Sequence, residues 1–263
     1  MTIAQRRLAV AGGTGLIGRM LVDLAGERGW TPIVLARSTG VELTTGAGLD
    51  AALEGVDTVV DVTNIGSANR SAAVEFFGTV SRNLLTAGRR AGVRHHLTLS
   101  IVGIDRVDTG YYAGKRRQEE VVAGGPVPWT VLRATQFYEF TEQLLGLVPG
   151  PVAVVPRMLS QPIAAREVAA HLLVLADARP AGRAPEIAGP ATHRMADLAR
   201  RLVRTRGLRR PVWELPALGA TARAAASGAL VPAEPGPRGT ESFEHWLSRS
   251  AGRPEVVRAG AVR

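Results

Sequence analysis

The stretch AVAGGTGLIG at residues 9–18 decides how the first part of this chain folds. It begins inside an apolar run at residues 7–11, which predicts a buried strand, and it ends inside a helical pattern. Gly12 permits a tight turn, Gly15 lets the backbone approach a diphosphate, and Gly18 lets the helix pack closely against the strand. A helix that begins here presents free N–H groups to an anion. The segment therefore predicts a phosphate-binding strand–turn–helix unit.

The same alternation of strand and helix patterns continues to about residue 147. Apolar runs predict strands at residues 7–11, 32–36, 41–43, 57–63, 94–100 and 129–133. Helical spacing predicts helices at residues 16–28, 49–54, 71–91, 111–123 and 135–147. Right-handed crossovers between such strands build a doubly wound parallel sheet of the α/β class. Its ligand site is expected beyond the carboxyl ends of the strands.

The pattern becomes looser after Pro149. We expect strands at residues 152–155 and 185–188 and helices at 166–176, 195–206 and 243–247. The predicted domains are therefore a Rossmann domain at residues 1–150, a smaller substrate-side lobe at 151–250, and a mobile tail at 251–263.

Composition excludes several kinds of site. The chain has 263 residues, is 46% apolar and has no cysteine, which excludes disulfides, thiolate metal sites and a cysteine nucleophile. The five histidines show no metal-ligand spacing, so we expect no metal. No segment has the length of a secretion signal or a membrane span. We expect a cytoplasmic protein that does not bind a membrane.

The positive charge argues weakly for nucleic acid as a partner. The chain has 32 basic and 23 acidic residues, a net charge of +9. The basic residues are spread along the chain without interleaved aromatics, so nucleic-acid binding is not favoured. Lys115 is the single lysine and the other 31 basic residues are arginine, which suggests a position that the bulky guanidinium cannot serve.

The glycine spacing Gly-x-x-Gly-x-x-Gly and its flanking residues resemble the atypical and extended short-chain dehydrogenase/reductase superfamily, particularly its NmrA-like group. The resemblance covers residues 6–175 well, 243–247 faintly, and little between. It implies an NAD(P)-binding Rossmann fold. The cofactor-binding residues expected in the first turn are Gly12, Thr14, Gly15, Leu16, Ile17 and Gly18.

The end of the second strand predicts which cofactor is preferred. Arg37 and Ser38 stand where an acidic residue would accept the ribose 2′-hydroxyl of NAD(H). A guanidinium can instead grip a 2′-phosphate, which favours NADP(H), with NAD(H) as the alternative. The plainer interpretation of Arg37 is a solvated surface arginine. Glu42 and Leu43 match the family's position near adenine, although Glu42 departs from the usual aspartate.

The resemblance also assigns residues farther along the chain. It implies that Thr63 and Asn64 run beside the ribose and diphosphate, and that Ala134, Thr135 and Gln136 pass the nicotinamide. It places Phe137 and Tyr138 on the substrate side, although aromatics at this spacing could equally be core residues of a helix.

The candidate catalytic residues are Ser100, Tyr111 and Lys115. Ser100 ends a predicted strand, and Tyr111 and Lys115 are four residues apart on one helix face, resembling the superfamily's triad. In carbonyl reduction a phenol can donate the proton, and a nearby ammonium lowers its pKa. The lysine can also hold the ribose, and Ser100 can polarise the substrate oxygen. Tyr112 is expected to pack or to line the substrate pocket.

These residues predict an NADPH-dependent reductase of a carbonyl, quinone or conjugated imine of a small hydrophobic or aromatic molecule. Two alternatives remain: a dinucleotide-sensing regulatory protein without catalysis, and a cofactor-retaining epimerase, dehydratase or cyclase. The Tyr-x-x-x-Lys pattern favours an enzyme over a sensor. The sequence carries no signal for oligomeric state.

Overall fold

A computed structural model describes residues 6–147 and 150–250 of the chain. These residues form two compact units. Unit 1 comprises residues up to 101 together with 109–133 and 166–185, and unit 2 comprises 102–108, 134–165 and the residues from 186 onward. The chain passes between the units several times, so the predicted division at residue 150 does not coincide with a unit boundary. The predicted mobile tail at 251–263 lies outside the described residues.

Unit 1 is built on a six-stranded parallel sheet with the order β2-β1-β3-β4-β5-β8. Its strands are β1 (Arg7–Ala11), β2 (Thr31–Leu35), β3 (Thr58–Asp61), β4 (His95–Ile101), β5 (Trp129–Ala134) and β8 (Gly182–Arg183). The chain runs outward from β1 to β2 and then crosses back to β3 on the other side of β1. The carboxyl ends of β1 and β3 therefore form the topological switch point, where ligands of such sheets bind.

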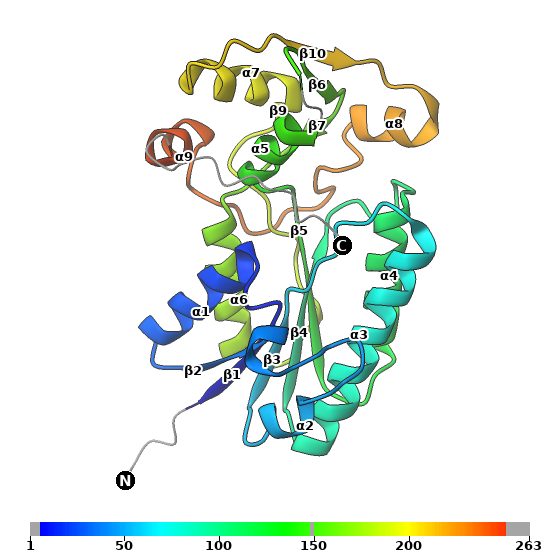
Figure 1. The fold of residues 1–263 in the computed structure, drawn as a ribbon, viewed down its shortest axis with the longest axis vertical. Coiled ribbons are helices and arrows are strands. Elements are labelled where there is room, and N and C mark those ends of the chain that lie inside the picture. Colours follow the sequence, from blue (N-terminus) through cyan, green and yellow to red (C-terminus); the bar gives the residue numbers. More distant parts are fainter. Residues whose placement is uncertain (1–5, 148–149, 251–263) are drawn as a thin grey trace. The chain divides into compact units, whose positions relative to one another are not determined.

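Helices cover both faces of this sheet, which confirms the predicted doubly wound Rossmann fold. They are α1 (Leu16–Glu27), α2 (Leu49–Ala52), α3 (Arg70–Ala91), α4 (Gly110–Ala123) and α6 (Ala165–Asp177), with a short 3₁₀ turn η1 (Arg37–Thr39). Figure 1 shows α3 and α4 side by side along one face of the strands, with α1 and α6 along the other.

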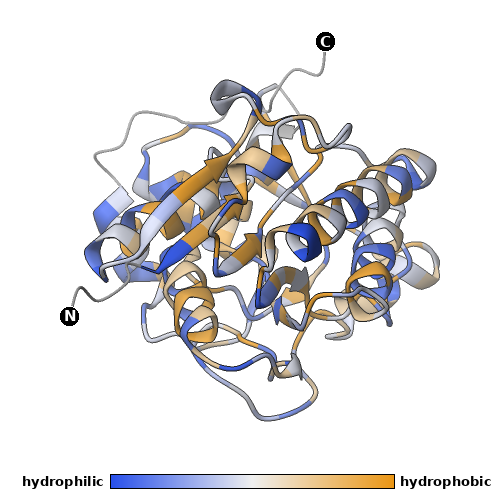
Figure 2. Cartoon of the chain, turned by 90° about the horizontal axis from the view of Figure 1, so that it is seen from below, coloured by the Kyte–Doolittle hydropathy of each residue, from blue (hydrophilic) through white to orange (hydrophobic). Residues whose placement is uncertain are grey.

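Local chemistry sets the ends of the two helices that matter most for the site. The Asn69 side chain caps α3 by accepting a hydrogen bond from the Ala72 amide, and Thr109 caps α4 through the Tyr112 amide. Residues 8–11 of β1 and the whole of β3 are buried, so the sheet forms the core. Figure 2 shows orange, apolar strands, whereas the helices carry both blue and orange residues, as helices packed on one face do.

The described residues of unit 2 form two small sheets and four helices. β6 (Ala153–Pro156) pairs in parallel with β10 (Val212–Leu215), and β7 (Leu159–Ser160) pairs antiparallel with β9 (His193–Arg194). The helices are α5 (Tyr138–Leu147), α7 (Met195–Thr205), α8 (Gly219–Ala226) and α9 (Phe243–Ser250). The α7 helix packs against α5, β6 and β10 with a fully buried apolar face.

Three predicted elements differ from the structure. Residues 41–43 form no strand, because Glu42 turns back to bridge Ala47 and its carboxylate binds Thr44. The strand expected at 185–188 is instead β8 at 182–183, followed by isolated bridges. Residues 135–137 are extended and not helical, because the Thr135 amide donates to Ile187 and Phe137 bridges Ile163.

The described residues contain neither a membrane-spanning helix nor a cluster of metal ligands. No helix within residues 6–147 and 150–250 is both long enough and apolar enough to cross a membrane. No group of three or more histidine or acidic side chains in the same ranges could hold a metal ion.

Candidate active site

The glycine turn after β1 is sterically restricted to glycine at two positions. Gly12 has a φ of 80°, and a Cβ there would stand 3.0 Å from the Val62 carbonyl oxygen at the end of β3. A Cβ at Gly18 would stand 2.1 Å from the Gly12 oxygen, which no side chain can accept. The turn therefore brings α1, β1 and the residues after β3 together at the switch point.

The first turn of α1 is open to an anion. Gly15 is the N-cap residue, no side chain caps the helix, and its first turn carries no acidic residue. Thr14 and Gly15 are exposed and Leu16 is half-buried, whereas the Ile17 side chain lies in the core. Unsatisfied N–H groups and the helix dipole at such an end suit a diphosphate. The cradle fits the diphosphate of a dinucleotide, with Ile17 able to contribute only its backbone.

The loop after β2 holds the residues predicted to contact the adenosine end. Arg37 and Ser38 are exposed in η1. The Glu42 carboxylate accepts hydrogen bonds from the Thr44 hydroxyl at 2.7 Å and the Thr44 amide at 3.1 Å. These bonds, with a smaller contribution from the charge of Arg37, lower the pKa of Glu42. Glu42 is therefore an ionised carboxylate already engaged by its own loop.

The side chain of Asn83 in α3 holds this loop through two hydrogen bonds. Its side-chain amide donates to the Leu43 oxygen at 2.9 Å and to the Thr44 oxygen at 3.0 Å. The bond fixes the backbone of Leu43, which was predicted to lie near adenine. Sequence reasoning missed Asn83, because a polar residue in the middle of a long helix gives no sign of a partner forty residues away.

The end of β3 carries a buried carboxylate. Asp61 is fully buried, and one of its oxygens accepts from the Thr63 amide at 3.0 Å and the Thr63 hydroxyl at 2.6 Å. Its other oxygen accepts from the Gln118 side-chain amide at 2.7 Å. The predicted contact residue Thr63 is thus held by Asp61, while its neighbour Asn64 is exposed.

Tyr111 of α4 reaches the loop after β3. Its hydroxyl donates to the Asn64 side-chain oxygen at 2.7 Å, and its ring packs edge-on against Phe77, 5.7 Å between centroids. Burial, with a smaller contribution from Tyr112, raises the pKa of Tyr111 well above its usual value. The expectation that Lys115 lowers this pKa is wrong in this structure. Tyr111 keeps its proton and presents it to Asn64.

Lys115 lies one helical turn farther along α4 and is buried. Its ammonium Nζ donates to the Leu99 carbonyl oxygen of β4 at 2.6 Å and also to the Gln118 side-chain oxygen. It stands 4.7 Å from the centre of the Phe77 ring. Burial lowers the pKa of Lys115 to about 8, against the opposing charges of Asp61 and Glu119.

Ser100 follows Leu99 in β4 and is 2% exposed. Its hydroxyl oxygen has no hydrogen-bond partner among the described residues. A buried hydroxyl without a partner is costly, so such a group in a folded protein requires an explanation, such as a ligand that satisfies it. The hydrogen bond from Lys115 to Leu99 places the lysine one residue from this hydroxyl along the strand.

The residues predicted to pass the nicotinamide, which are Ala134, Thr135 and Gln136, belong to unit 2. The predicted catalytic residues belong to unit 1. Ala134 and Thr135 are 2% exposed, and the Thr135 hydroxyl donates to the Gln161 oxygen at 2.7 Å. The Gln136 side-chain oxygen accepts from Ser160 at 2.6 Å, which leaves its amide nitrogen buried without a partner in the described ranges. Tyr112 and Phe137 are half-buried. The contacts of these residues with a nicotinamide or a substrate stay predictions.

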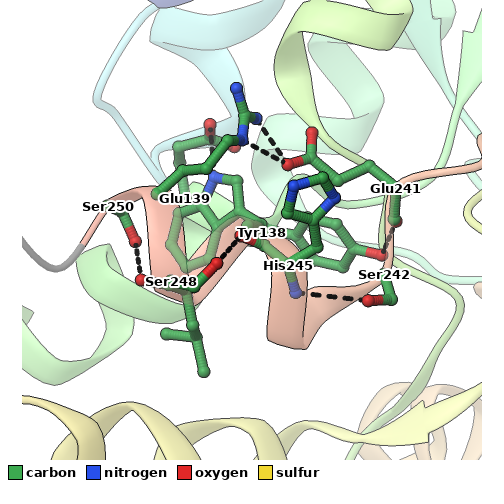
Figure 3. Close-up of polar contacts among 10 residues, drawn as sticks. Tyr138, Glu139, Glu241, Ser242, His245, Ser248 and Ser250 are labelled. Atoms are coloured by element: carbon green, nitrogen blue, oxygen red, sulfur yellow. Dashed lines mark hydrogen bonds and ion pairs between the residues drawn. The ribbon is translucent and has the colours of Figure 1, made fainter.

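Tyr138 corrects the predicted substrate wall. Its side chain is fully buried and its hydroxyl donates to the Glu241 carbonyl oxygen at 2.8 Å. Its ring packs at 5.3 Å from Phe243 and 5.7 Å from Trp246, and Figure 3 shows Tyr138 among the side chains of α9. Tyr138 is therefore a core residue of unit 2, because a ring enclosed by two other rings presents no face to a substrate.

Sequence reasoning also missed Asp61 and Gln118. Asp61 is the acidic residue within the apolar strand pattern DTVVDVT, and Gln118 is three residues after Lys115, on the same helix face. These two positions could have indicated that Asp61 and Gln118 interact, because a carboxylate in a buried strand needs a partner.

Comparisons with known proteins place these observations in a family. The model of a family described as NAD(P)H-binding matches residues 37–176. A reductase of (4-alkanoyl-5-oxo-2,5-dihydrofuran-3-yl)methyl phosphate from Streptomyces griseus is 32% identical over 222 residues, covering 75% of this chain and 74% of that protein. A ceramide reductase from Caulobacter vibrioides is 28% identical over 155 residues, covering 52% of this chain and 48% of that protein.

Two solved structures show the same fold. A short-chain dehydrogenase/reductase superfamily protein from Agrobacterium tumefaciens with bound NAD has a TM-score of 0.71 and 19% identity, with 94% of this chain and 96% of that chain covered. A dTDP-4-dehydrorhamnose reductase from Bacillus anthracis in complex with NADP has a TM-score of 0.70 and 12% identity, with 95% and 98% covered. The neighbours thus include both NAD and NADP complexes.

Proposed function

We propose that this chain, which belongs to the NAD(P)H-binding family and is an NAD(P)H-dependent oxidoreductase with the fold of a short-chain dehydrogenase/reductase, uses NADPH. The proposed reaction is the reduction of a carbonyl, quinone or conjugated imine of a small hydrophobic or aromatic molecule. The bond from Lys115 Nζ to the Leu99 oxygen carries this proposal. It ties the helix that bears Tyr111 to the strand that bears Ser100.

Each of the three residues has a separate task. Tyr111 donates the proton, which a phenol holds at neutral pH and which burial, by raising the pKa of Tyr111, holds more firmly still. Ser100 donates a hydrogen bond to the substrate oxygen, which gives its orphaned hydroxyl a partner. Lys115 supplies positive charge beside Ser100 and can hold ribose hydroxyls of the cofactor. The reduced nicotinamide, when bound, supplies the hydride.

Asn64 controls when Tyr111 can act. The phenolic proton is directed at the Asn64 oxygen, so proton donation to a substrate requires this bond to break. Asn64 lies on an exposed loop, and its side-chain oxygen also accepts from the Ile65 amide at 2.8 Å. Turning the side chain away breaks both hydrogen bonds, which water can replace at an exposed site.

The hydrophobic substrate class is supported by the relatives' names. The Streptomyces griseus relative is named for an alkanoyl compound, and the Caulobacter vibrioides relative for a ceramide. Both names describe molecules with apolar acyl groups. We infer that this chain accepts a substrate with a comparable apolar part.

The reaction is tested by mixing the protein with NADPH and a panel of carbonyl, quinone and imine compounds and following reduced-nicotinamide absorbance. We expect substrate-dependent loss that falls at least about 100-fold in Tyr111→Phe, the usual contribution of a positioned general acid. Tyr138→Phe, whose hydroxyl donates to a backbone oxygen in unit 2, is the control and should keep most of the activity. NADPH binding without turnover across the panel would favour a sensor, and substrate turnover without NADPH loss would favour a cofactor-retaining enzyme.

The preference for NADPH is tested separately by binding. Arg37 is exposed after β2, where its guanidinium can pair with a 2′-phosphate. Arg37→Ala should weaken NADPH binding about 10-fold or more, as expected for the loss of a charge-assisted pair, and leave NADH binding unchanged. Arg28→Ala, at an exposed arginine at the opposite end of α1 from the glycine turn, is the control. Equal weakening of both coenzymes in Arg37→Ala would contradict the preference.

A further inference from the structure

A continuous series of hydrogen bonds crosses the interior of unit 1 from β3 to β4. The Thr63 hydroxyl donates to Asp61, the Gln118 amide donates to the other Asp61 oxygen, and Lys115 donates to Gln118 and to the Leu99 oxygen. Asp61 and Gln118 are fully buried and Lys115 is 3% exposed. A buried carboxylate and a buried ammonium are thus joined through one amide.

The hydrogen-bonding capacities of Asp61 and Lys115 fix the orientation of the Gln118 side-chain amide. An ionised carboxylate can only accept hydrogen bonds and an ammonium can only donate them. Gln118 must therefore turn its nitrogen to Asp61 and its oxygen to Lys115, as it does here. Its single orientation locks the position of Lys115 Nζ beside β4.

Burying this pair does not serve stability alone. Removing two charges from water costs several kcal/mol per ion, and apolar residues of similar size often serve a core as well or better. The retained lysine is also the only one in a chain with 31 arginines. A costly buried cation of an otherwise avoided residue type indicates a task for that cation.

We propose that Asp61 and Gln118 are positioning residues that keep Lys115 protonated and aimed at the strand that carries Ser100. This inference rests on the proposed function, because it matters to the reaction only if Lys115 takes part in it. Asp61 supplies the compensating charge, and Gln118 carries the geometry from β3 to α4.

The other groups around Lys115 also affect how readily it holds its proton. Phe77 from α3 offers only a ring face, and β4 offers the Leu99 oxygen. Glu119 of α4 adds a second favourable charge, although it is already paired with Arg133. His96 of β4 lies near Asp61 and stays neutral, since burial lowers its pKa to about 4. Asp61 is therefore the carboxylate that acts on Lys115 through the Gln118 amide.

The single lysine allows a direct test. Protein labelled with ¹³C-lysine gives one lysine side-chain signal set, so an NMR titration of the Cε shift reports the protonation of Lys115 alone. We expect its midpoint to fall by about one pH unit or more in Asp61→Asn and in Gln118→Met. Glu120→Gln, which removes an exposed charge from the same helix, should leave the midpoint unchanged. An unchanged midpoint in Asp61→Asn overturns the proposal.

A kinetic measurement separates positioning from a merely structural role. In Asp61→Asn the alkaline limb of the kcat/KM profile should move to lower pH by the same shift as the lysine midpoint. A shifted midpoint with an unmoved profile overturns the positioning role. If Asp61→Asn fails to fold, Gln118→Met, which removes the amide between Asp61 and Lys115, serves in its place and should move the midpoint and the profile in the same direction.

Lys115→Met distinguishes this inference from the proposed function. Full reductase activity in Lys115→Met contradicts the proposed role of the lysine and with it the positioning role. Loss of activity in Lys115→Met, together with an unchanged lysine midpoint in Asp61→Asn, leaves the proposed function standing and overturns only the inference.

Discussion

Two tyrosines, one in each unit, show how the surroundings of a phenol decide what it can do. Tyr111 in unit 1 is only partly buried, and its hydroxyl donates to the side chain of Asn64 on an exposed loop. Tyr138 in unit 2 is fully buried, and its hydroxyl donates to the backbone oxygen of Glu241. A side-chain partner can turn away, whereas a backbone partner inside the core cannot. Only Tyr111 is therefore in a position to release its proton to another acceptor.

The buried groups of the two units differ as well. Both tyrosine rings contact other aromatic rings, but the interior of unit 1 also holds buried ionisable and amide groups, including Asp61, Gln118 and Lys115. Around Tyr138 the interior of unit 2 holds the rings of Phe243 and Trp246, stacked 5.5 Å apart. Polar interiors are costly and aromatic interiors are stabilising. We conclude that the buried polar groups of unit 1 lower its stability and serve the reaction, whereas the aromatic cluster of unit 2 stabilises the fold.

The largest expected effect tests the packing side of this comparison. Trp246→Ala removes a 5%-exposed ring from the cluster and should lower the free energy of unfolding by about 3–5 kcal/mol, as other buried aromatic deletions do. Chemical denaturation measures it. His245→Ala, at the exposed neighbouring position of α9, is the control and should cost far less. Equal losses of unfolding free energy at the two positions would contradict the claim that the aromatic cluster stabilises unit 2.

Buried ionisable groups in the two units should also change the acid stability of the chain in opposite directions. The folded chain keeps His96 neutral with a pKa of about 4, below the ordinary value of 6.5, so below pH 6.5 the unfolded chain binds more protons. Stability should therefore fall by about 3 kcal/mol as the pH drops from 6.5 to 4, at about 1.4 kcal/mol per unit. His96→Leu should flatten this slope. An identical slope in the variant would contradict the assignment.

Glu139 in unit 2 should act in the opposite direction. Burial raises the pKa of Glu139, although its hydrogen bond from the Trp246 ring nitrogen opposes this. The folded chain then binds the proton more readily than the unfolded chain, so this group favours folding as the pH falls through its raised pKa. Glu139→Gln should therefore make the acid loss of stability steeper than in the wild type. A shallower loss would contradict the sign.

The smallest effect concerns the hydroxyl of Tyr138. Tyr138→Phe removes the donor to Glu241 and should cost about 1–2 kcal/mol, the usual range for one buried hydrogen bond. Thermal unfolding of this variant beside Tyr111→Phe sharpens the comparison, because Asn64 is exposed and can bind water instead. A larger loss in Tyr111→Phe than in Tyr138→Phe would mean that the two hydroxyls have the reverse roles.

The order of strands and helices in unit 1 could be predicted because it follows from local patterns. The glycine turn, the apolar strand runs and the caps at Asn69 and Thr109 act within a few residues of one another. The turn of Glu42 could not be predicted, because its partner Thr44 competes with strand pairing by a side-chain bond that the apolar pattern does not report.

The candidate site was predicted only in part, for a similar reason. Helical spacing put Tyr111 and Lys115 on one face, but it could not identify the polar partners of either residue. Gln118 and Asp61 are 57 residues apart in the chain, and only the fold brings them together. Tyr138 was misassigned because the spacing of aromatics on a helix does not distinguish a core face from a ligand face.

The most direct test of the account is the rate of NADPH oxidation with one accepted substrate, compared between Tyr111→Phe and Tyr138→Phe at equal folded fractions. We predict that Tyr111→Phe loses at least about 100-fold in kcat/KM, whereas Tyr138→Phe stays within about threefold of the wild type. Equal rates in the two variants, or a slower Tyr138→Phe, would contradict the assignment of the proton donor.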